Sequence, residues 1–144
     1  CITSYIVFIL AKKLFNNVSL ALCCSLTFFL LPSVSFSSFL ISTDILLILL
    51  WTWGLVQVLI IKENPSYLNF GMLGLLLGLA FLTKYAAIYF IVGLILLFVI
   101  ERNFRLVVLQ SKFKLLISSL IVILILFPNI LWNYQNKERL LNLS

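Results

Sequence analysis

Asp44 is the acidic residue that lies at the edge of an apolar segment, where it could serve as a catalytic group. It closes Ser42-Thr43-Asp44 and precedes the apolar run ILLILLW. One interpretation is a helix N-cap, in which the carboxylate accepts backbone N–H bonds and favours the positive end of the helix dipole. The other is a catalytic or ion-binding carboxylate, since ionisable groups at membrane depth are costly and tend to be functional. The two roles are compatible.

Lys84 is the second candidate, and it has no acidic neighbour in the sequence. It lies in Thr83-Lys84-Tyr85, which interrupts a long apolar stretch. A lysine at the centre of a bilayer costs about 2.5–3.5 kcal/mol, so its side chain either extends to the membrane surface or has a function. A compact ammonium is well suited to hold a phosphate or pyrophosphate group.

Other familiar chemistry is excluded by composition. The chain has no histidine and three cysteines, Cys1, Cys23 and Cys24. Without histidine no Ser/His/Asp or Cys/His arrangement can form. The cysteines also lack metal-ligand spacing, so the usual zinc sites are excluded and the cysteines are interpreted as packing residues.

The composition is that of a membrane protein. Of the 144 residues, 64% are hydrophobic and 10% are charged, and the mean hydropathy is +1.25. A soluble domain carries about 25% charged residues to cover its surface. The net charge of +6 fits the excess of Lys and Arg in cytoplasmic loops. No basic run interleaved with aromatic residues is present, which argues against nucleic-acid binding.

Apolar segments predict an all-α, polytopic bundle of about six transmembrane helices. A spanning helix needs about 20 apolar residues. The chain opens in an apolar run without a signal peptide, so we expect an internal fragment whose first span is truncated. The predicted spans are 1–11, 18–36, 44–61, two halves of 68–100 divided at Lys84, and 115–132.

The basic residues predict the orientation of these spans. One side collects Lys12, Lys13, Lys62, Arg102, Arg105, Lys112 and Lys114, against Lys84, Lys137 and Arg139 on the other. The first side is therefore expected in the cytoplasm. The loop 37–43, the turn at 83–85 and the C-terminal tail would then face outward. The basic stretch RNFRLVVLQSKFK (102–114) is expected to lie along the cytoplasmic interface.

Three glycines fall on one predicted helix. Gly71, Gly74 and Gly78 include a GxxxG pair, and small residues at this spacing allow close approach of membrane helices. They do not match a nucleotide-binding loop, which would require a preceding strand.

Three segments, in order, resemble a known family. These are STDILLILLW, GMLGLLLGLAFLTKYAAIYFIVGLILLF and FPNILWNYQN. They are similar to segments of the GT-C membrane glycosyltransferases of the protein-mannosyltransferase and aminoarabinose-transferase type, and the resemblance covers about residues 15–136. It departs at Ser42, where the family often has proline, and after Gln135, where the usual His-Gly-Trp is missing.

The resemblance implies an integral membrane enzyme of the bacterial inner or plasma membrane. Such enzymes transfer a hexose or pentose, with inversion, from a polyprenyl-phosphate carrier to a lipid, glycan or protein acceptor on the outer face. Asp44 matches a site-lining acidic position. The match places substrate-binding positions at Lys84, Tyr85, Trp132, Asn133 and Gln135. It implies no certain cofactor beyond the lipid-linked sugar and leaves a divalent metal ion open.

The family's principal catalytic acid lies in a first outer loop, upstream of the segments matched here. Residues 1–144 are therefore expected to form part of a single transmembrane glycosyltransferase domain, and to be inactive alone. Two alternatives remain at this point. One is a fragment of a transporter or permease, because charges at membrane depth also mark substrate pathways. The other is a membrane subunit without catalytic function.

Overall fold

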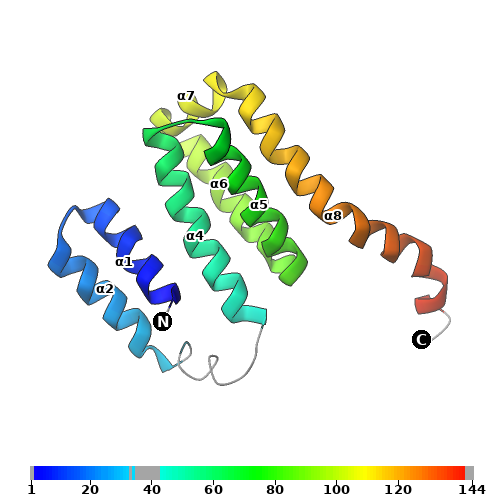
Figure 1. Ribbon diagram of the computed structural model, residues 1–144, viewed down its shortest axis with the longest axis horizontal. Coiled ribbons are helices and arrows are strands. Elements are labelled where there is room, and N and C mark those ends of the chain that lie inside the picture. Colours follow the sequence, from blue (N-terminus) through cyan, green and yellow to red (C-terminus); the bar gives the residue numbers. More distant parts are fainter. Residues whose placement is uncertain (1, 33, 35–42, 142–144) are drawn as a thin grey trace.

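The described residues fold into α-helices (Figure 1). The computed structural model describes residues 2–32, 34 and 43–141, with backbone alone for 137–141. In apolar surroundings each backbone N–H and C=O group must form its hydrogen bond within its own segment, and an α-helix meets this requirement. The predicted all-α fold is confirmed. The helices are α1 (Ile2–Phe15), α2 (Val18–Leu30), α4 (Thr43–Glu63), α5 (Tyr67–Thr83), the 3-10 turn η1 (Tyr85–Ala87), α6 (Ile88–Ile100), α7 (Arg102–Gln110) and α8 (Lys112–Leu141).

The helix pairs in contact include neighbours in the sequence and helices further apart along the chain. The hairpin of α1 and α2 contacts α4 through α1, α4 packs against α5, and α5 packs against α8. Figure 1 shows α1 and α2 at one side, α4 and α5 in the middle, and α8 on the other side, where it extends away from the remaining helices. Short connections place α1 beside α2 and α4 beside α5 as antiparallel pairs. The contacts of α1 with α4 and of α5 with α8 join helices that are not consecutive in the chain.

The expected count of about six membrane spans is not confirmed. Among the described residues, two helical segments are long and apolar enough to cross a membrane, Thr43–Glu63 and Lys112–Asn136, and the bent pair of η1–α6 with α7 would make a third. The other apolar helices are short: α5, with 17 residues, rises about 26 Å, less than the roughly 30 Å of a hydrocarbon core. The end of the predicted span 18–36 and most of the loop 37–43 lie outside the described residues.

The predicted division of the stretch 68–100 at Lys84 is confirmed. Helix α5 ends at Thr83, and Lys84 adopts extended backbone angles (φ −161°, ψ 137°) before η1 begins. The Lys84 N–H still donates to Ala80 O at 3.1 Å. The Thr83 hydroxyl donates to the same carbonyl at 2.6 Å. These bonds satisfy a carbonyl that the helix end would otherwise leave free.

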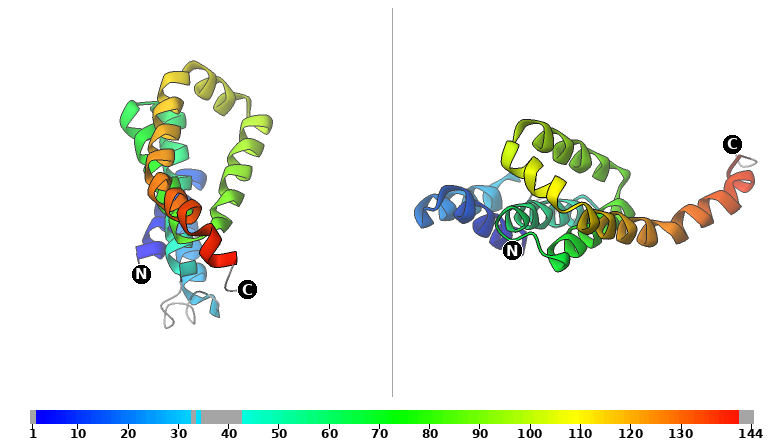
Figure 2. Two further views of the ribbon diagram at one scale, coloured as in Figure 1. Left: turned by 90° about the vertical axis from the view of Figure 1, so that its right-hand side faces the viewer. Right: turned by 90° about the horizontal axis from the view of Figure 1, so that it is seen from above.

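The basic stretch expected at the interface forms α7 and the start of α8. Helix α7 is bent by 104° from the preceding η1–α6 segment, so it lies across the end of the bundle (Figure 2). Within α7, Phe104 is buried while Arg102 is exposed, as expected of an amphipathic helix. The stretch is not one element, because α7 ends at Gln110 and α8 begins at Lys112, with Ser111 between them. The predicted polar tail after 132 continues as helix to Leu141.

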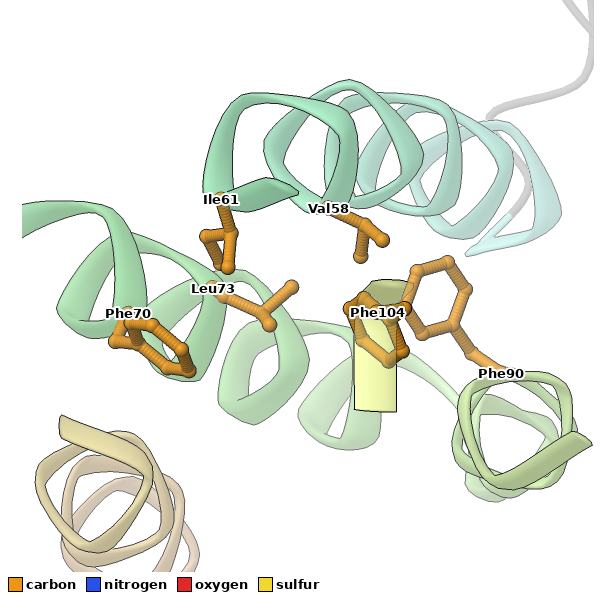
Figure 3. Close-up of a cluster of buried hydrophobic side chains, with 6 residues drawn as sticks. All are labelled: Val58, Ile61, Phe70, Leu73, Phe90 and Phe104. Carbon is orange, nitrogen blue, oxygen red and sulfur yellow. The ribbon is translucent and has the colours of Figure 1, made fainter. Parts of the chain in front are cut away.

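The core lies among α4, α5, α6 and α7. Figure 3 shows its six buried side chains, which are Val58, Ile61, Phe70, Leu73, Phe90 and Phe104. A second cluster lies between the first half of α4 and the end of α5, and contains Leu47, Leu50, Leu76, Ala80 and Ala87. Close packing of these side chains fixes the position of α4 against α5, and so brings the beginning of α4 to the end of α5.

The predicted close approach at the glycines is confirmed between α5 and α8. A β-carbon added at Gly74 would lie 2.5 Å from the Ser118 carbonyl oxygen, and one at Gly78 would lie 2.7 Å from Ile125 Cδ1. Gly71 has more room, with its nearest neighbour, Ile121, at 3.6 Å. Glycine at 74 and 78 therefore sets the helix separation that van der Waals packing requires here.

One end of the bundle carries most of the basic residues and is called the basic end below. Lys13 and Glu63 pair at 2.6 Å, joining the ends of α1 and α4. Lys62 and Glu101 pair at 2.5 Å, joining the ends of α4 and α6. Lys114, near the start of α8, donates to the carbonyl of Pro65. The grouping of residues 12–17, 62–67 and 101–114 on one side is therefore confirmed.

Candidate functional site

Asp44 lies in the first turn of α4. The helix begins at Thr43, so Asp44 is inside the helix rather than at the N-cap position that one interpretation gave it. A carboxylate in the first turn is still favoured by the positive end of the helix dipole. Its side chain is about half exposed.

Lys84 occupies the extended position between α5 and η1, and its ammonium meets the Asp44 carboxylate. Lys84 Nζ donates to Asp44 Oδ1 at 2.6 Å. The two residues are 40 positions apart, yet α4 and α5 are successive antiparallel helices, which places the start of one beside the end of the other. The structure thus joins two residues that the sequence singled out separately.

The Asp44–Lys84 pair lies at the end of α4 and α5 opposite to the basic end. The side chains are 50% and 49% exposed, and an exposed ion pair contributes only about 0.2–1 kcal/mol to stability. The pair therefore contributes little to the stability of the fold. Chemically, the carboxylate can accept a proton or orient a hydroxyl, and the ammonium can neutralise a phosphate oxygen.

Tyr85 follows Lys84 directly and is 76% exposed. It begins η1, so the extended break at Lys84 places Tyr85 at the same end of the bundle as the ion pair. A phenol here has both an apolar ring and a hydroxyl available to a ligand.

Trp132, Asn133 and Gln135 are not brought to the ion pair. They lie on the C-terminal part of α8, which extends away from α4 and α5 in both Figure 1 and Figure 2. Trp132 is 60% exposed, and Asn133 Nδ2 donates to Asn129 Oδ1 one turn earlier. The cause is the packing of α8, which touches α5 through the segment around Ser118 and Ile125.

Trp51 is a candidate that the sequence analysis gave no role. It lies two turns after Asp44 on α4, and its indole Nε1 is buried without an acceptor among the described residues. Its ring centroid is 6.3 Å from that of Phe90, beside a cavity of about 280 Å³ between α4 and α6. Buried hydrogen-bond donors are nearly always paired, so the unpaired Nε1 of Trp51 marks a position where a ligand could accept a hydrogen bond. In the sequence, the signal for this position was a tryptophan in the middle of an apolar helix.

No group of three or more histidine, cysteine, aspartate or glutamate side chains gathers within the described ranges. Of the side chains that the structure describes at this end, the Asp44 carboxylate could contribute to holding a cation.

The sequence of the chain matches a family model over most of its length. The dolichyl-phosphate-mannose-protein mannosyltransferase family matches residues 1–132. The chain belongs to this family. The resemblance to GT-C membrane glycosyltransferases is thereby confirmed, and membership favours a membrane glycosyltransferase over a transporter.

A curated relative agrees with the family. The lipid A galacturonosyltransferase RgtD of Rhizobium johnstonii is 28% identical over 112 residues, which cover 78% of this chain and 23% of the relative. The chain thus spans about a quarter of the length of the relative that it matches. No solved structure matches the chain.

Proposed function

We propose that the full-length protein containing this chain transfers a sugar from a polyprenyl-phosphate carrier to an acceptor at the outer face of the membrane. The observation that carries the proposal is the 2.6 Å pair of Asp44 and Lys84, at the end of the bundle opposite to the basic end. Family membership supports a lipid-linked sugar as donor and a separate acceptor.

Each residue of the pair has a role in this proposal. The Lys84 ammonium holds the phosphate of the donor and stabilises the charge that grows on it as the bond to the anomeric carbon breaks. Asp44 orients Lys84 and lines the acceptor side. An acceptor hydroxyl attacks the anomeric carbon with inversion, and its proton passes to the principal acidic residue, which we place outside residues 1–144. Tyr85, Trp132, Asn133 and Gln135 complete the substrate contacts in the full-length domain.

The basic end supports the orientation that we propose. An excess of Lys and Arg favours the cytoplasmic side, which would put Asp44 and Lys84 outside the cytoplasm. Successive helices alternate between the two ends, and we propose that about six of them cross the bacterial inner or plasma membrane as parts of one transmembrane domain. The short helices would then cross the membrane while packed against neighbouring helices of the full-length protein.

The donor is tested with purified full-length protein in proteoliposomes. We expect sugar transfer when a radiolabelled polyprenyl-phosphate sugar is supplied, and none with the nucleotide sugar alone. Parallel reactions with EDTA decide whether a divalent metal ion contributes. Transfer from the nucleotide sugar, at a rate comparable to that from the lipid-linked sugar, would contradict the proposal.

A further inference from the structure

A second candidate site lies at the basic end, away from Asp44 and Lys84. It is a cavity of about 370 Å³ among α4, α5, α6, α7 and α8, a volume within the range of ligand pockets. Its inner wall includes Ile61, Phe70, Leu73 and Phe104, four of the core side chains in Figure 3. Helix α7 crosses between α6 and α8 at this end (Figure 2). The cavity lies beneath it.

The cavity is apolar inside and opens to the molecular surface. Its outer lining includes Ile95 of α6, Leu109 of α7 and Leu115 of α8, which are exposed. A soluble ligand with several polar groups would find few partners on such walls, whereas a hydrocarbon chain fits them.

One cation lines this cavity, and a second lies on α7, the helix that contributes Leu109 to the lining. Lys112 is its one charged lining residue and is exposed at the start of α8. Arg105 lies one turn before Leu109 on α7, and residues at this spacing share a helix face. In the described part of the chain neither cation belongs to an ion pair, unlike Lys13, Lys62 and Lys84. Both charges therefore remain available to an anion.

We propose that an anionic phospholipid of the surrounding bilayer binds here. One acyl chain occupies the apolar cavity beneath α7, and the phosphate headgroup contacts Lys112 and Arg105. The combination of an apolar interior and nearby unneutralised cations matches a molecule with a long hydrocarbon chain and one negative head. The site lies at the opposite end of the bundle from Asp44 and Lys84, so the inference does not depend on the proposed function.

Lipid binding is tested on the full-length protein by native mass spectrometry in non-ionic detergent. Phosphatidylglycerol and phosphatidylcholine are titrated in parallel. Each basic residue near a membrane surface contributes about a fivefold increase in affinity for an anionic lipid. Arg105→Gln with Lys112→Gln is therefore expected to lower the affinity for phosphatidylglycerol by at least about tenfold. Ile95→Trp, which fills the cavity without a change of charge, is expected to lower it as well.

The matched control is Lys12→Gln, which removes an exposed cation from the same end but outside the cavity lining. Lys12→Gln should leave phosphatidylglycerol affinity unchanged. Equal losses in Lys12→Gln and in the double variant would show a general charge effect and overturn the proposal. So would full retention of phosphatidylglycerol in both the double variant and Ile95→Trp, which is the result expected if another segment of the full-length protein fills the cavity.

Discussion

Asp44→Asn in the full-length protein is expected to lower kcat/KM for sugar transfer by about 100-fold, the effect typical of losing one preorganised electrostatic group. The substitution keeps the size of the side chain but removes the charge that holds Lys84 Nζ at 2.6 Å.

Lys84→Gln should raise the KM for the lipid-linked donor as well as lower kcat, because the ammonium contacts the donor in the ground state. Initial rates at varied donor concentration measure both effects.

Glu63→Gln is the matched control for Asp44→Asn. Glu63 also pairs with a lysine across two helices at 2.6 Å, but at the basic end. If ion pairs matter only for stability, the two variants should lose similar amounts of activity and of thermal stability. We expect Asp44→Asn alone to lose activity, with a melting temperature close to that of Glu63→Gln. Equal and small losses of activity would contradict the role given to Asp44.

Gly74→Ala is expected to destabilise the protein, because α5 and α8 touch at this position. The added methyl group would lie 2.5 Å from the carbonyl oxygen and 2.9 Å from the Cα of Ser118. Backbone atoms cannot turn aside as a flexible side chain can, so the helices must separate. Overpacking of this kind costs about 1–3 kcal/mol, and thermal unfolding of the full-length protein in detergent measures it.

Gly93→Ala is the control for Gly74→Ala, since a β-carbon at Gly93 meets nothing within 4 Å. Alanine also has a higher helix propensity than glycine, so Gly93→Ala should leave the melting temperature unchanged or raise it slightly. A melting temperature for Gly74→Ala equal to that of Gly93→Ala would show that α5 and α8 are not closely packed in the full-length protein.

Much of the helical fold is predictable from the sequence. Apolar composition predicts helices, and Thr83-Lys84-Tyr85 predicts the break that separates α5 from η1, because a lysine there interrupts a continuous apolar run. The lengths of individual helices were less predictable. Where a helix ends depends on local capping and packing, such as the Thr83 and Lys84 bonds to Ala80 O, rather than on hydrophobicity alone.

The candidate site could be predicted in part. Asp44 and Lys84 each stand out as charges at the edges of apolar segments, but their contact depends on the packing of α4 against α5. Trp132, Asn133 and Gln135 follow from the family resemblance, and their position along α8 keeps them apart from the ion pair here. The cavity beneath α7 was not predictable, because it arises from the 104° bend between η1–α6 and α7.

The most direct test of the account is photo-crosslinking of the donor to the full-length protein. A photoreactive phenylalanine analogue is placed at Tyr85, beside Lys84, or at Tyr67, which lies near the basic end with Lys114 Nζ 5.3 Å from its ring centroid. Both tyrosines are exposed, at 76% and 58%. The account predicts that, with excess phosphatidylglycerol present to occupy the lipid site at the basic end, a radiolabelled polyprenyl-phosphate sugar is captured from position 85 and not from position 67. Capture from position 67 alone, or equally from both positions, would contradict a donor site at Asp44 and Lys84.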